Sequence, residues 1–144
     1  MTDLVFVDTN VLVYFHDATE PDKQAPAARW LEALWRRRTG RISYQVLQEF
    51  YVTVTAKLDP GLAAETARES VQALEAWKPV AVGGPILARA WSVQDRYSLS
   101  WWDALIVSAA QSAGCSALLT EDLQHGQDLD GLTVISPFRS EPAE

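Results

Sequence analysis

The stretch LVFVDTNVLV, residues 4–13, determines how the rest of the chain is interpreted. Leu4 to Val7 is a short, non-alternating apolar run rich in β-branched residues, which predicts a strand buried on both faces of a parallel sheet. Asp8 follows at once and should lie at the carboxyl end of that strand, where ligands bind in open α/β sheets. Taken alone, this carboxylate is either a helix cap or the first part of a site.

The size and composition indicate one ordinary globular domain. The chain has 144 residues, of which 48% are hydrophobic and 22% charged. We expect a single domain over residues 1–136 and a polar, loose tail over residues 137–144. No signal peptide or membrane-spanning run is recognised, and a single cysteine, Cys115, allows no internal disulfide, so a cytoplasmic location is expected. The net charge of −7 argues against a purely electrostatic nucleic-acid binder, but not against an enzyme that meets nucleic acid through bound cations.

Strand-like and helix-like patterns alternate along the chain. A short first helix should follow Asp8, and residues 17–26 are expected to form a loop. Further strands are expected at residues 41–43, 79–82, 117–120 and 132–135, and further helices at residues 27–38, 44–58, 62–77, 86–97 and 101–113. This order predicts an α/β fold, a three-layer α/β/α sandwich with a mainly parallel sheet of about five strands.

Four acidic residues stand in apolar surroundings, whereas the other acids are dispersed among polar residues. Asp8 and Asp122 end predicted strands, while Glu49 and Asp103 lie near the starts of predicted helices. Helices that follow parallel strands begin at the carboxyl edge of the sheet, so all four acids are expected at one edge. Clustered carboxylates repel one another unless a cation lies between them. Oxygen ligands without His or Cys partners suit Mg²⁺ or Mn²⁺.

Each of these acids also has a purely structural interpretation. Asp8 and Asp122 could cap the elements that follow them, and Glu49 could pair with an arginine. Ser100 and Asp103 have the spacing of a capping box, although that box normally ends in Glu or Gln. One metal site explains all four positions together.

The histidines and a group of arginines are the other residues whose chemistry bears on the site. Neither histidine, His16 or His125, has metal-ligand spacing to a partner, and both are expected at the surface. A basic group follows the second predicted helix and could guide a phosphate backbone or complement the helix dipole: Arg36, Arg37, Arg38 and Arg41.

Four segments taken together resemble the PIN domain family. They are residues 7–12 (VDTNVL), Glu49, residues 102–110 (WDALIVSAA) and residues 118–122 (LLTED). The chain is most similar to the stand-alone, VapC-like toxins of toxin–antitoxin pairs. That resemblance implies an α/β/α sandwich, a Mg²⁺-dependent ribonuclease (with Mn²⁺ as a possible substitute), an antitoxin partner and a homodimer.

The resemblance also implies a role for each residue of the motifs. The acidic quartet would be Asp8, Glu49, Asp103 and Asp122. Asp8, Asp103 and Asp122 would bind the metal directly or through water, and Glu49 would bind a water ligand of the metal or the metal itself. Thr9, Asn10 and Thr120 would orient these carboxylates. Glu121 precedes Asp122, so the identity of the fourth acid stays open between them.

Two alternatives remain at this point. In a phosphotransferase of the haloacid-dehalogenase type, an Asp after the first strand is the nucleophile, but Asn10 stands where that family has a second Asp. Such an enzyme would also leave Glu49 and Asp103 without a role. The other alternative is a catalytically silent PIN-fold module that binds RNA or protein.

Overall fold

The computed structural model describes residues 3–143 and contains one five-stranded sheet with the order β2-β1-β3-β5-β4. The strands are β1 (Val5–Val7), β2 (Gly40–Arg41), β3 (Ala117–Leu119), β4 (Asp128–Leu129) and β5 (Leu132–Ile135). Strands β2, β1, β3 and β5 run parallel, and β4 pairs antiparallel with β5. The prediction of a mainly parallel sheet of about five strands is confirmed.

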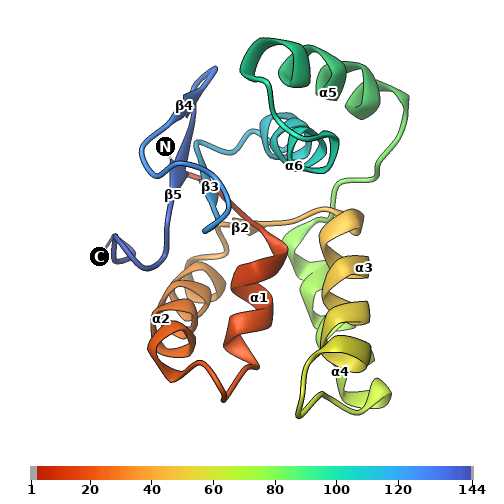
Figure 1. Cartoon of the computed structure of the whole chain (residues 1–144), viewed down its shortest axis with the longest axis vertical. Coiled ribbons are helices and arrows are strands. Elements are labelled where there is room, and N and C mark those ends of the chain that lie inside the picture. Colours follow the sequence, from red (N-terminus) through yellow and green to blue (C-terminus); the bar gives the residue numbers. More distant parts are fainter. Residues whose placement is uncertain (1–2, 144) are drawn as a thin grey trace.

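Helices connect the parallel strands and cover the sheet. They are α1 (Thr9–Phe15), α2 (Pro21–Arg37), α3 (Tyr44–Val52) with its π-helical extension η1 (Thr53–Lys57), α4 (Ala64–Leu74) with the 3₁₀ turn η2 (Glu75–Trp77), α5 (Gly84–Tyr97) and α6 (Trp101–Ser112). Figure 1 shows α2 and α6 on opposite sides of the strands. The chain moves from β1 to β2 at one edge of the sheet and then crosses back past β1 to β3. Crossovers in opposite directions place their helices on opposite faces of a parallel sheet.

The central strands are apolar because they are covered on both faces. Phe6 and Val7 of β1 and Leu118 and Leu119 of β3 are fully buried. Three helices start beside the carboxyl edge of the sheet with a side-chain cap, from Asp8 for α1, Ser43 for α3 and Ser100 for α6. Each cap satisfies a backbone N–H of the first turn and fixes where the helix begins.

Two expected elements differ in the structure. Residues 79–82 do not form a strand: Val80 makes a single bridge to Ser43, with hydrogen bonds of 3.0 Å to the backbone of residues 42 and 44. The prediction of a loop over residues 17–26 was wrong for its second half, because α2 begins at Pro21. Proline is well tolerated at the first position of a helix, where its missing N–H costs no hydrogen bond.

The polar C-terminal segment lies against α2 rather than free of the domain. The indole of Trp30 donates a 2.8 Å hydrogen bond to the carbonyl oxygen of Ser140. Arg29 makes two hydrogen bonds of 2.9 Å to the carboxylate of Glu141. The expectation of a loose tail is corrected by these contacts. Within residues 3–143, no helix is both long enough and apolar enough to cross a membrane.

Candidate metal centre

Asp8 is both a helix cap and a buried carboxyl group at the carboxyl end of β1. Only 7% of the residue is exposed. One carboxylate oxygen accepts a 2.7 Å hydrogen bond from the backbone N–H of Thr9, and the other accepts a 2.8 Å bond from the hydroxyl of Thr120. The two interpretations of Asp8 are therefore compatible, since the cap uses one oxygen and leaves the other directed toward β3.

The pKa of Asp8 is raised to about 7, chiefly because burial removes water from the charged carboxylate. The hydrogen bonds from Thr120 and Thr9 lower this pKa, while the negative charges of Asp122 and Glu49 raise it further. The pKa of Asp122 is also raised, first by desolvation and then by the neighbouring acids. A bound cation would offset both effects.

Asn10 joins the two strand-end carboxylates through its side-chain amide. Its Nδ2 lies 3.1 Å from Oδ2 of Asp122, 3.2 Å from the hydroxyl oxygen of Thr120 and 3.5 Å from Oδ2 of Asp8. The Thr120 hydroxyl also accepts a 3.1 Å bond from the backbone N–H of Asp122. Asn10 and Thr120 therefore hold Asp8 and Asp122 in a common network.

Glu49 reaches the same place from α3. The hydroxyl of Thr9 donates a 2.7 Å hydrogen bond to its carboxylate. Asp103 approaches from the first turn of α6, where its backbone N–H is capped by the Ser100 hydroxyl at 3.2 Å. That cap accounts for the backbone of Asp103 and leaves its carboxylate to line the pocket.

One pocket of about 730 Å³ has all four acids in its wall. Trp102, Gln45 and Lys57 are also among its lining residues. The indole of Trp102 is 63% exposed. Both polar atoms of the Gln45 amide are buried without a hydrogen-bond partner. The expectation that one sheet edge collects the four acids is met in the geometry, and their catalytic roles remain predictions.

Glu121 and Asp122 face different surroundings. Glu121 is engaged by the Tyr14 hydroxyl and by Lys23, whose Nζ lies 3.1 Å from its carboxylate. Asp122 lines the acidic pocket and accepts a hydrogen bond from the side-chain amide of Asn10. This difference favours Asp122 as the fourth acid.

The carboxylate oxygens of the pocket are the ligand type that a hard divalent cation prefers, but they do not fill its coordination sphere. Among residues 3–143, no three Asp, Glu, His or Cys side chains lie close enough together to hold one ion by themselves. Mg²⁺ retains several waters and uses only one or two carboxylates in many protein sites. A buried, desolvated Asp8 with Asp103 and Asp122 around one pocket matches that requirement.

The basic residues suggested for substrate binding do not line this pocket. Helix α2 leads into β2, so its last residues, Arg36 and Arg37, lie at the amino edge of the sheet. Arg41 donates to the backbone oxygens of residues 38 and 40. Lys57, the last residue of the π-helical extension η1, does line the acidic pocket, and the sequence alone did not indicate it.

The two histidines are only partly exposed. His16 packs against Phe50 with ring centroids 5.5 Å apart, and burial lowers its pKa. Nδ1 of His125 accepts a 3.0 Å hydrogen bond from the backbone N–H of Ser136. Both side chains therefore have structural roles that the expectation of surface residues did not include.

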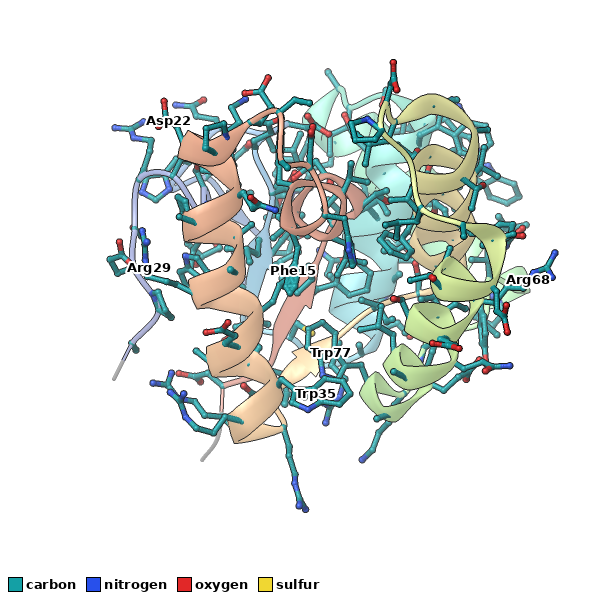
Figure 2. All side chains as sticks on the ribbon, turned by 90° about the horizontal axis from the view of Figure 1, so that it is seen from below. Phe15, Asp22, Arg29, Trp35, Arg68 and Trp77 are labelled. Atoms are coloured by element: carbon teal, nitrogen blue, oxygen red, sulfur yellow. The ribbon has the colours of Figure 1, made fainter. Side chains whose placement is uncertain are left out.

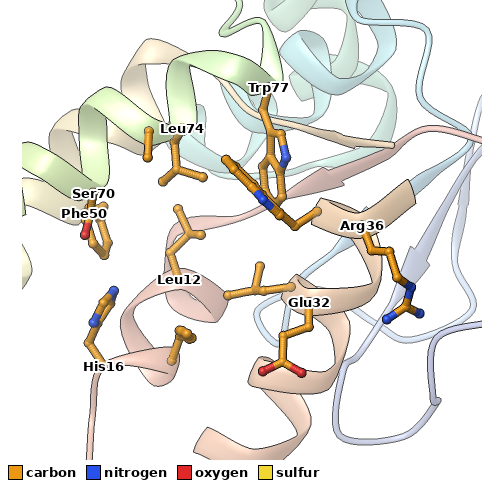
Figure 3. A pocket seen from close by; sticks show the side chains of 12 residues that line it. Leu12, His16, Glu32, Arg36, Phe50, Ser70, Leu74 and Trp77 are labelled. Atoms are coloured by element: carbon orange, nitrogen blue, oxygen red, sulfur yellow. The ribbon is translucent and has the colours of Figure 1, made fainter. Parts of the chain in front are cut away.

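A second hollow of about 430 Å³ lies on the other side of α1 and is mostly apolar (Figure 3). Its wall includes Leu12, Phe50, Leu74 and Trp77. Figure 2 shows Trp35 beside Trp77, and their ring centroids are 6.0 Å apart. This hollow has no carboxylate cluster, so it suits an apolar side chain rather than a metal ion.

Comparisons with known proteins agree with this fold. A toxin–antitoxin complex from Klebsiella pneumoniae is similar with a TM-score of 0.68 and 20% identity, over 96% of this chain and 99% of the other. VapC20 of Mycobacterium tuberculosis, a sarcin–ricin-loop-cleaving toxin, gives 0.60 and 19%, over 79% and 86%. FitAcB from Neisseria gonorrhoeae gives 0.62 and 17%, over 95% and 100%. No curated protein matches the chain.

A sequence model of the PIN domain matches residues 5–127, which contain β1, the four acids and the whole acidic pocket. The match and the sheet order agree on one architecture, with the acids at the carboxyl edge of a parallel sheet. The chain therefore belongs to the PIN domain family.

Proposed function

We propose that this protein is a Mg²⁺-dependent endoribonuclease and the toxin of a toxin–antitoxin pair. The observation that carries the proposal is the buried Asp8, whose pKa is raised to about 7, in a pocket that it shares with three other acids. A buried carboxylate surrounded by like charges is poorly stabilised by the protein alone. A cation bound there would relieve this cost and is what phosphodiester hydrolysis needs.

Asp8, Asp103 and Asp122 would hold Mg²⁺, or Mn²⁺ in its place, directly or through its water ligands. When bound, the ion neutralises charge on the phosphate and lowers the pKa of water. The chain's own residues do the positioning: Thr120 and Thr9 hold the Asp8 carboxylate in one orientation. Asn10 holds Asp122 toward Asp8.

Glu49 would accept the proton of the attacking water. The Thr9 hydroxyl donates to one of its oxygens, which leaves the other to face the pocket. Water attacks phosphorus, the bond from phosphorus to the leaving oxygen breaks, and that oxygen is protonated from solvent. The reaction needs no ribose hydroxyl, so the substrate must be distinguished by binding.

Two features of the pocket support a single-stranded nucleic acid as the substrate. The exposed indole of Trp102 offers a face on which an unpaired base can stack, next to Asp103. Lys57 can neutralise a neighbouring phosphate, which the rest of the acidic wall would repel. The relative VapC20 is described as cleaving the sarcin–ricin loop, an RNA target.

The apolar hollow supports an antitoxin partner. A structure with the same fold comes from a toxin–antitoxin complex. An amphipathic helix of such a partner would place apolar side chains among Leu12, Trp35 and Trp77. A basic side chain following that helix could pair with the acids in place of the metal. The homodimer and the cytoplasmic location remain predictions.

The test is cleavage of a single-stranded RNA by the purified protein with Mg²⁺, with Mn²⁺ and with EDTA. We expect cleavage with either metal and none with EDTA. Trapping of a phosphorylated Asp8 would instead favour the phosphotransferase. Binding of RNA with no cleavage under any metal condition would favour the silent module.

A further inference from the structure

Four side chains from three distant parts of the chain meet beside the acidic pocket: Tyr14, Lys23, Glu121 and Phe138, here called the Glu121 cluster. The Tyr14 hydroxyl donates to one carboxylate oxygen of Glu121. Nζ of Lys23 lies 3.1 Å from the other oxygen and 3.0 Å from the Tyr14 hydroxyl. Both oxygens of Glu121 are therefore engaged by other side chains, and Glu121 itself does not line the pocket.

Phe138 completes the cluster from the C-terminal segment. Its ring meets the ring of Tyr14 edge to face, with centroids 5.5 Å apart. Nζ of Lys23 lies 4.8 Å from the centroid of Tyr14 and 5.5 Å from that of Phe138, within the range of cation–π attraction. The bonds of residues 140 and 141 to α2 keep this segment in place.

The cluster is joined to the acidic pocket through the backbone of Glu121. Glu121 stands between Thr120, which donates to Asp8, and Asp122, which lines the pocket. Its backbone N–H donates to Oδ1 of Asn10 at 3.4 Å, while Nδ2 of the same amide binds Asp122 at 3.1 Å. Moving Glu121 would therefore move Asp122 and the amide that orients it.

We infer that Glu121 is a positioning residue, which the Lys23–Tyr14 pair and Phe138 hold so that Asp122 is presented to the metal. This inference rests on the proposed function. A partly exposed ion pair such as Lys23–Glu121 contributes little to global stability. Its effect should therefore appear in metal binding more than in folding. Glu121 thus acts through its neighbour Asp122, and Phe138, which lies beyond the matched residues 5–127, contributes to the site.

The experiment titrates Mg²⁺ against the full chain and its Glu121→Gln variant, by thermal unfolding and by RNA cleavage. Glutamine keeps the shape of the side chain but loses the charge that holds Lys23. We expect the half-saturating Mg²⁺ concentration to rise about tenfold, as when a group that orients a metal ligand is lost. The cleavage rate at saturating Mg²⁺ should fall far less than that, and the melting temperature without metal should change little.

Further variants separate positioning from general damage. Phe138→Leu and Lys23→Met should raise the Mg²⁺ requirement in the same direction, and Lys23→Arg should restore it in part. Asp130→Asn is the matched control, because it removes another exposed carboxylate, paired with Arg96 at 3.3 Å, outside the acidic pocket. It should leave the Mg²⁺ titration as in the wild type.

The outcomes distinguish this inference from the proposed function. A wild-type protein that responds to Mg²⁺, with Glu121→Gln titrating identically, overturns the inference alone. Loss of cleavage in Glu121→Gln at every Mg²⁺ concentration also overturns it, because Glu121 would then be a ligand. A wild-type protein with no Mg²⁺ response and no cleavage overturns the proposed function and the inference together.

Discussion

The acidic pocket and the apolar hollow share the walls of α1 and α3 but have opposite chemistry. On α3, Glu49 lines the acidic pocket, and its neighbour Phe50 lines the apolar hollow. On α1, Asn10 and Leu12 divide in the same way. The acidic pocket concentrates charge that water no longer solvates, so it is unfavourable until a cation enters. The apolar hollow is stabilised when its apolar surface is removed from water. A partner's apolar side chains can therefore occupy it without any change in charge.

Because neighbouring residues on one helix serve different hollows, substitutions should separate catalysis from partner binding. Changes in the acidic pocket should abolish cleavage and leave the apolar contacts of a partner helix with the hollow intact, removing only the pairing of the partner's basic side chain with the acids. Changes in the hollow should do the reverse. A variant that lost both functions while remaining folded would contradict this division.

The largest effect should come from Asp8→Asn, which removes a metal ligand but keeps the shape of the side chain. Losing the metal forfeits several kcal/mol of charge stabilisation, and about 1.4 kcal/mol is tenfold, so cleavage should fall by about 1,000-fold or more. Expression of this variant without the antitoxin should not arrest growth. Without metal, its melting temperature should rise by a few degrees, because the buried charge is gone.

RNA cleavage, growth and thermal unfolding measure these three effects on one variant. Asp103→Asn should behave similarly in cleavage. A folded Asp8→Asn protein that still cuts RNA and arrests growth would mean that Asp8 is only a helix cap.

Thr9→Ala should have a smaller effect, which is confined to the acidic pocket. Its hydroxyl donates to Glu49 at 2.7 Å, and the backbone cap of Asp8 does not need the side chain. Loss of such an orienting bond typically costs about 10–100-fold in activity or metal affinity. Cleavage kinetics at several Mg²⁺ concentrations measure the loss. Thr9→Ser keeps the hydroxyl and should stay near the wild-type rate; if both variants fall equally, the methyl group and not the hydrogen bond is responsible.

Trp35→Ala should affect the apolar hollow alone. The residue is 49% exposed and packs on Trp77, so it can anchor a partner without being essential to the core. Truncation of an aromatic anchor costs about 2 kcal/mol or more, which is roughly a 30-fold loss of affinity. Calorimetry with the cognate antitoxin measures the change. Trp91→Ala is the control, since Trp91 is 59% exposed on α5 and should bind as the wild type does.

The sequence predicted the buried elements and the shared edge of the acids because both follow from local pattern and topology. Residues 4–7 and 117–120 are apolar runs that need cover on both faces, and β1 and β3 are buried accordingly. Four acids in apolar surroundings were expected at one edge, and they line one pocket. Other residues that line the acidic pocket, such as Gln45 and Lys57, were not predicted, because nothing in the local sequence distinguishes them from ordinary surface residues.

The differences between the predicted and the observed strands have specific physical reasons. Strand β4 is two residues long, too short for a periodic pattern, although Asp130-Gly131 after it is a typical hairpin turn. Both turn residues have positive φ, and Asp128 accepts the backbone N–H of Gly131 at 2.9 Å. Residues 79–82 have the composition of a strand but find only one backbone partner, Ser43, so a single bridge forms. Pairing depends on the neighbours available in space, which composition does not reveal.

The smallest effect expected is a pH dependence that distinguishes the acidic pocket from the hollow. The folded pKa of Asp8 is raised from 3.8 to about 7. Without metal, the stability that comes from protonated Asp8 is complete below pH 3.8 and is lost as the pH rises through 7. Mg²⁺ must displace that proton, so its apparent affinity should rise about tenfold per pH unit below pH 7 and level off above it. Thermal unfolding from pH 5.5 to 8.5, with and without Mg²⁺, should therefore show a metal-induced stabilisation that grows with pH. Asp8→Asn should flatten this dependence, whereas Trp35→Ala should keep it, and a pH-independent Mg²⁺ response in the wild type would mean that Asp8 is not the group the metal neutralises.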